Sequence, residues 1–144
     1  MGTLIFVEDN EVMPSQDFIK ENTVRHIFSC YNEQKELPPS PIVRLSEDKK
    51  NYIAIDGHNL LAVNGFLGKK TKVYVANSPE DKITSKENTD PDALIKRNFE
   101  LKTKFDACLL EVKKTQQKGI VCFNDLRNKY PLVNWSTLGK TYKG

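Results

Sequence analysis

The sequence predicts an α+β fold: a small mixed sheet with short helices at residues 1–80, then a helical extension at residues 88–144. Short apolar stretches bounded by charged or proline-rich turns fill the first part, which is typical of strands. In the second part, apolar residues recur every three or four positions, as one face of a helix requires. Hydrophobic residues make up 38% of the 144 residues, which is enough for a sizeable core.

The first third of the chain begins with a short apolar run at residues 4–7. From Thr23 onward apolar residues fall at helical spacing, and the side chain of Asn22 or Thr23 can cap that helix. The proline-rich stretch at residues 37–41 ends the helix, because proline lacks an amide donor and clashes with the preceding turn. Residues 42–45 then read as a strand.

A strand–helix–strand unit follows. Residues 52–55 form its first strand, because two isoleucines at alternate positions can face one side. A short helix runs from about His58 to Phe66 and stops at Gly68, which suits the left-handed position after a helix. Residues 71–76 form the second strand.

The helical extension begins at Asp90 and Pro91, with aspartate as the N-cap and proline at the first helical position. An apolar stripe continues from there to Gly119, which predicts one long helix. Phe99 and Phe105 fall within that stripe and are expected in the core. Such a stripe must be buried against the domain or against a partner.

Charge is distributed unevenly, although the net charge is only +3. Residues 1–90 carry 11 Lys and Arg against 14 Asp and Glu, whereas residues 91–144 carry 11 against 5. We favour packing of the basic helix, or a homodimer formed through it, over the alternative that residues 96–118 contact DNA. DNA contact would require these charges on one face, with groups that stack on or read the bases nearby.

Location is predicted to be cytoplasmic, with no membrane partner. The longest apolar runs fall far short of the roughly 20 residues that span a bilayer, and residues 1–9 lack the pattern of a signal peptide. Cys30, Cys108 and Cys122 are widely spaced and odd in number, which favours reduced thiols over disulfides or a structural zinc site.

The most informative motif is the junction between residues 52–55 and the next helix, which reads Asp56, Gly57, His58, Asn59. The first turn of a helix has free N–H groups and a partial positive charge, so anions bind there. Glycine lets the backbone approach a phosphate, His58 and Asn59 add donors, and Asp56 could orient the histidine or hold Mg²⁺. Equally, the motif can be a tight turn with a capping aspartate and a surface histidine.

The order of these segments resembles the ParB/sulfiredoxin superfamily over residues 4–76. Its members typically read "PI-V", a short turn, "Y-I-DGHHRL-A", "LG" and a "V-V-V" strand, and the matching segments here are residues 41–44, 52–62 and 68–75. The resemblance implies a nucleotide-binding fold that holds ATP or CTP phosphates at a Gly-His-x-Arg box. Members include DNA-partitioning CTPases, plasmid-encoded nucleases, free-serine kinases and sulfiredoxins.

Carried over by position, Gly57 and His58 match this box and Asp56 matches the acid before it. Asn59 stands where the family has a second histidine, and Leu60 where it has the arginine. That arginine would make charge-assisted contacts to phosphate, which leucine cannot make. Candidates to replace it are Arg44, Lys69 and Lys70. Sulfiredoxin activity is excluded, because its catalytic cysteine lies in this box and position 58 is histidine.

The leading hypothesis is a ParB-like nuclease-domain protein that binds a nucleotide or phosphorylated ligand at residues 56–59. Mg²⁺-dependent NTPase or nuclease chemistry would then use His58, Asp56 and Glu11, the last by analogy with kinase-like members. The second hypothesis is a catalytically silent binding or regulatory module whose basic helix docks a protein partner or DNA. A small-molecule kinase of the free-serine type is a third, family-level alternative.

Overall fold

The computed structural model describes residues 2–84, 90–130 and 133–142. Five strands form one mixed sheet in the order β1-β5-β3-β4-β2. The pairs β1–β5 and β3–β4 are antiparallel, and the pairs β3–β5 and β2–β4 are parallel. The strands are β1 (Thr3–Val7), β2 (Val12–Met13), β3 (Ile42–Leu45), β4 (Tyr52–Asp56) and β5 (Thr71–Val75).

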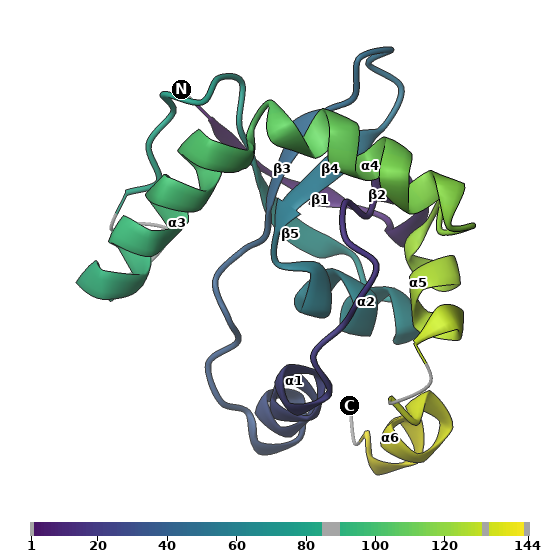
Figure 1. Ribbon diagram of the computed structural model, residues 1–144. Coiled ribbons are helices and arrows are strands. Elements are labelled where there is room, and N and C mark those ends of the chain that lie inside the picture. The colour runs from purple at the N-terminus through teal and green to yellow at the C-terminus, as the bar shows by residue number, and fades with distance from the viewer. Residues whose placement is uncertain (1, 85–89, 131–132, 143–144) are drawn as a thin grey trace.

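Helices cover both faces of the sheet (Figure 1), and the prediction of an α+β fold is confirmed. One face carries the first, second, fifth and sixth α-helices, and the other carries the third and fourth. The helices are η1 (Asp9–Glu11), α1 (Glu21–Glu33), α2 (His58–Phe66), α3 (Pro91–Lys104), α4 (Ala107–Gln117), α5 (Phe123–Lys129) and α6 (Trp135–Thr141).

Two cores lie on opposite faces of the sheet, because neighbouring residues of a strand point to opposite sides. Ala54 of β4 packs into the first core, with Phe28 of α1 and Phe123 of α5. Its neighbour Ile53 packs into the second core, with Leu101 of α3. The helices after residue 88 therefore help to build both cores.

The strand–helix–strand unit agrees with the sequence. Helix α2 has the predicted bounds, and Gly68 follows it with φ of +71°, a conformation that side chains other than glycine rarely adopt. The start of α1 differs from the prediction. Neither Asn22 nor Thr23 caps this helix; its N-cap is Lys20, whose backbone N–H donates to Asn59 Oδ1 at 2.9 Å. A contact distant in sequence thus fixes where α1 begins.

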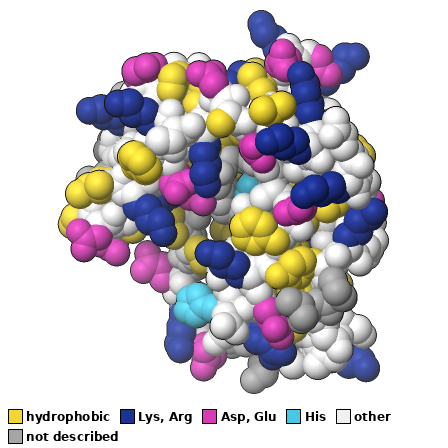
Figure 2. All heavy atoms as spheres, viewed as in Figure 1, with side chains coloured by type: hydrophobic (Ala, Val, Ile, Leu, Met, Phe, Trp, Pro, Cys, Tyr) yellow, Lys and Arg dark blue, Asp and Glu magenta, His cyan; other side chains and the backbone are white. Residues whose placement is uncertain are grey.

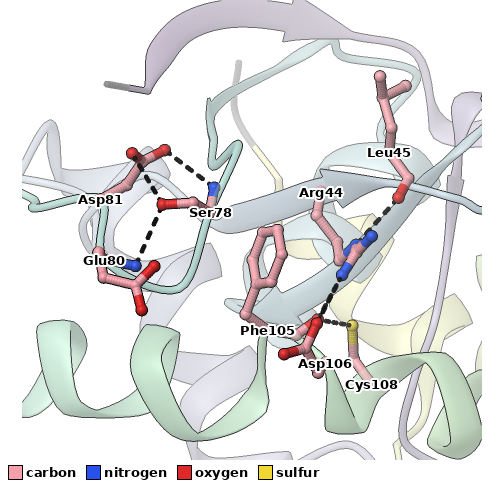
Figure 3. Close-up of polar contacts among 8 residues, drawn as sticks. All are labelled: Arg44, Leu45, Ser78, Glu80, Asp81, Phe105, Asp106 and Cys108. Carbon is pink, nitrogen blue, oxygen red and sulfur yellow. Dashed lines mark hydrogen bonds and ion pairs between the residues drawn. The ribbon is translucent and has the colours of Figure 1, made fainter.

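The single long helix predicted from Pro91 to Gly119 is wrong: the chain breaks it between α3 and α4. Arg44 lies at the break (Figure 3), with its guanidinium 4.1 Å from the centre of the Phe105 ring. The Phe105 carbonyl accepts from Arg44 Nη1 at 2.8 Å and from Cys108 Sγ at 3.3 Å. Burial raises the pKa of the Cys108 thiol to about 11, so the thiol keeps the proton that it donates.

The break also changes which residues of α3 are buried. Phe105 is buried as expected, but Phe99 is 63% exposed, which corrects the prediction that it lies in the core. Leu101 and, unexpectedly, Arg97 face the sheet instead. The predicted stripe assumes one straight helix, whereas two shorter helices can each turn a different side inward.

Among the helices of the described ranges, none has the length and apolar character needed to cross a membrane.

Candidate functional site

A cleft of about 400 Å³ opens at the N-terminus of α2. Its walls come from four parts of the chain: the β4–α2 junction at residues 56–59, helix α3, the loop at residues 38–40, and the segment between β2 and α1. We call this last segment, residues 14–20, the strap. Figure 1 shows that the strap and the loop after α1 both run between α1 and the sheet.

The cleft brings together cations that lie far apart in the sequence. Lys20 of the strap and Lys96, Arg97 and Lys104 of α3 line it, together with the acids Asp56 and Glu100. On the face that carries α3 and α4, Lys and Arg side chains are interspersed with Asp and Glu (Figure 2), so the excess of cations is a property of the cleft lining. With His58 neutral, four positive and two negative groups give the cleft a positive potential, which favours anionic ligands.

Arg97 is the most buried of these cations, with 7% of its surface exposed. Its Nε lies 3.9 Å from Asp56 Oδ2, and its Nη2 donates to the Ser40 carbonyl. Lys104 pairs with Glu100 at 2.6 Å, whereas Asp56 keeps 41% of its side chain exposed. The acid of the junction therefore faces an arginine of α3.

His58 is buried, with 3% of its surface exposed. Its Nε2 accepts the backbone N–H of Ser15 at 3.0 Å, so the neutral ring carries its proton on Nδ1. Burial, and to a smaller extent the charge of Lys104, lowers the pKa of His58 to about 3. The ring is thus neutral at pH 7 and holds the strap through Nε2.

The strap is fixed at both ends to the β4–α2 region. Ser15 Oγ donates to the Ala54 carbonyl at 2.6 Å, in addition to the bond that Ser15 makes with His58. At the other end, Lys20 bonds to Asn59. Two residues of the sequence motif, His58 and Asn59, are therefore anchors for the strap.

Gly57 adopts φ of +87° at the N-cap of α2. A Cβ at this position would lie 2.6 Å from Pro41 Cβ and 2.7 Å from Pro41 Cα. The missing side chain therefore makes room for Pro41. That it also lets a phosphate approach the backbone stays a prediction. Both the backbone angle and Pro41 require glycine at this position.

The three cations predicted to replace the family's arginine lie outside the cleft lining. Arg44 packs on Phe105 at the α3–α4 junction. Lys69 Nζ lies 5.3 Å from the ring centre of Tyr31, and Lys70 pairs with Glu8 at 3.6 Å.

Glu11 lies outside the cleft lining as well. It belongs to η1, which packs against α2, and its Oε1 accepts the Glu8 N–H at 2.7 Å. Leu60, at the position of the family's arginine, is buried in the first core.

The motif at residues 56–59 does line the cleft, but the sequence did not identify the cations opposite it. Lys96, Arg97 and Lys104 belong to the basic excess of the C-terminal part, and that excess was the only signal for them. The packing of α3 on β4 places them in the cleft. Within residues 2–84, 90–130 and 133–142, no three His, Cys, Asp or Glu side chains gather in a way that could hold a metal ion.

No protein-family model matches the chain, and no curated protein matches it either.

Proposed function

We propose that this protein binds a phosphorylated ligand, with a nucleotide such as ATP or CTP as the leading candidate, in the cleft at the N-terminus of α2. One observation carries the proposal: the first turn of α2 and four cations from two distant segments line the same cleft. A volume of about 400 Å³ lies within the range of about 300–1,000 Å³ that is common for small-molecule sites.

The first turn of α2 contributes backbone donors and a partial positive charge. The first N–H that bonds within this helix is that of Leu61, which donates to the Gly57 carbonyl. The N–H groups of residues 58–60 precede it and have no acceptor inside the helix. A phosphate placed there would also meet Lys96 and Arg97 of α3, which line the same cleft.

The resemblance to the ParB/sulfiredoxin superfamily agrees with this location but not with the same donors. In that family an arginine of the box contacts phosphate, and here the equivalent Leu60 is buried in the core. We propose that Lys96 and Arg97 of α3 take over this contact. Arg44, Lys69 and Lys70, the candidates that the sequence offers for this role, lie outside the cleft lining.

The structure supports ligand binding better than it supports catalysis by His58 and Glu11. The Nε2 of His58 is occupied by Ser15, and Glu11 lies outside the cleft lining. This supports the hypothesis of a binding or regulatory module.

Contact with DNA or a protein through residues 96–118, and a homodimer, remain predictions. A cytoplasmic location is also a proposal, and the free thiols of Cys30, Cys108 and Cys122 fit it.

Mg²⁺-dependent hydrolysis of the bound nucleotide is a second candidate, because two carboxylates, Asp56 and Glu100, line the cleft. Magnesium is commonly held by one or two carboxylates together with substrate phosphates. Asp56 is the better ligand of the two, since Glu100 pairs closely with Lys104. Phosphate release from ATP or CTP in the presence of Mg²⁺ would support hydrolysis, provided that the Asp56→Asn variant loses it. Nuclease and serine kinase assays test the two related predictions.

Isothermal titration with ATP, CTP and GTP tests the proposal. Lys96→Ala should lower the affinity for the nucleotide that binds by about tenfold or more, because a hydrogen bond to a charged group contributes about 1.5–3 kcal/mol. Lys102→Ala is the matched control: it removes an exposed lysine of the same helix that lines a different groove. Equal losses in the two variants, or no binding of any nucleotide, would contradict the proposal.

A further inference from the structure

One aromatic side chain stands on the wall of this basic cleft. Phe18 of the strap is 42% exposed and lines the cleft beside Lys20. The loop residues Pro38 and Pro39 also line it. The cleft thus combines an apolar rim with a cationic wall on α3.

The strap holds Phe18 in this place. Its neighbour Ile19 is fully buried in the first core, which directs the adjacent side chain outward. Gln16 Nε2 donates to the Phe18 carbonyl at 2.9 Å, and Asp17 pairs with Lys118 at 2.5 Å. Because the bonds of Ser15 and Lys20 fix the two ends, the backbone that carries Phe18 is held in place before any ligand arrives, and little backbone entropy is lost on contact.

Excess positive charge distinguishes the cleft at α2 from the groove on the other side of the strap. A second groove lies between the strap and α4, and Phe18 lines it too. There each lysine has an acidic partner: Lys118 pairs with Asp17, and Lys114 lies 3.4 Å from Glu111. Of these two neighbouring grooves, only the cleft at α2 has more cations than acids along its lining, which favours the phosphates of one nucleotide over a strand that continues past the strap.

We propose that Phe18 is the specificity-determining wall of the cleft: a nucleobase stacks on its ring while the phosphates meet α2 and α3. The ligand is then a mononucleotide and not a simple phosphate ester or a nucleic-acid strand. This inference rests on the proposed function. Stacking of a base on an aromatic side chain is tolerant of base identity, so Phe18 selects nucleotides as a class.

The test compares ATP and CTP with inorganic tripolyphosphate, which carries the charges without a base. Phe18→Ala should lower the affinity for the nucleotides by about tenfold and leave the affinity for tripolyphosphate unchanged. Phe18→Tyr should retain nucleotide binding. Phe99→Ala is the control, since Phe99 is also an exposed phenylalanine and lines a different groove. Melting temperatures of all variants show that the fold is retained.

The outcomes separate the two proposals. If tripolyphosphate binds as tightly as ATP and Phe18→Ala changes neither, the role of Phe18 is wrong while the phosphate site stands. If no nucleotide and no tripolyphosphate binds, the proposed function itself fails. If an oligothymidylate binds more tightly than ATP and CTP and competes with them, the proposal of a mononucleotide ligand is wrong and the ligand is a single strand.

Discussion

Arg97 of α3 and Asp56 at the end of β4 face each other, with Nε and Oδ2 3.9 Å apart. This pair joins the most informative motif of the sequence to a helix that lies outside the family resemblance. Arg97 lies on the buried side of α3 and reaches the cleft wall. Helix α3 therefore completes the candidate site as well as the second core.

Arg97→Met should separate these two roles. Methionine keeps much of the apolar length of arginine, so packing of α3 should largely survive, and Asp56 remains accessible to water. We expect nucleotide affinity to fall by tenfold or more, because a buried cation is lost. Calorimetric titration and a melting curve measure the two effects. Unchanged affinity in a folded variant would remove Arg97 from the site.

His58 should make stability depend on pH. Its pKa is lowered from 6.5 to about 3 in the folded protein, so only the unfolded chain takes up this proton between these values. Its contribution to stability is therefore complete above about pH 6.5 and declines as the pH falls, by up to about 1.4 kcal/mol per pH unit.

Urea unfolding at pH 5.0 and 7.5 measures this effect. His58→Gln, whose amide oxygen can accept from Ser15, should be less sensitive to pH over this interval. His26→Gln is the control, since His26 is exposed and on α1. If His58→Gln retained the full pH dependence of the natural chain, the neutral buried ring would not be its source.

The two glycines that flank α2 should respond differently to alanine. Gly57→Ala combines a left-handed backbone with a Cβ only 2.6 Å from Pro41, so we expect a loss of about 3 kcal/mol or more. Gly68→Ala has the same type of backbone strain but open space, so about 1 kcal/mol should be lost. Chemical denaturation of both variants tests the difference, and equal losses would show that Pro41 is not the constraint.

Arg127 should be a structural and not a ligand-binding cation. It is buried, donates to both carboxylate oxygens of Asp9 at 3.2 and 2.7 Å, and donates to the Ala62 carbonyl at 3.0 Å. Removing one partner of such a pair costs roughly 3–5 kcal/mol, so Asp9→Asn should lower stability by about 3 kcal/mol because Asp9 is partly exposed. Nucleotide affinity, measured below the melting temperature, should not change. A loss of affinity without loss of stability would contradict this role.

Local patterns were sufficient to predict α2, its glycine stop and the strands on either side of it, because each depends on residues close in sequence. They failed at the α3–α4 break, where no proline or glycine intervenes between Pro91 and Lys118. There Arg44 and Cys108 stabilise the freed Phe105 carbonyl. Nothing in the spacing of α3 could reveal a partner from β3.

The candidate site divides in the same way. The sequence located residues 56–59 at a strand-to-helix turn, which lines the cleft. It did not reveal that His58 and Asn59 hold the strap, or that Arg97 faces Asp56, since each of these contacts joins segments about 40 residues apart. A histidine that binds phosphate and one that anchors a backbone amide look the same in a sequence.

Backbone amide NMR of the ¹⁵N-labelled chain during titration with ATP, and separately with CTP, tests the central claim most directly. A phosphate at the N-terminus of α2 should shift the amides of Asn59 and Leu60 most strongly, together with those around Lys96 on α3. Amides near Lys113 on α4 should change little. Shifts centred on α4, or saturation with ATP or CTP that leaves the first turn of α2 unperturbed, would contradict the account.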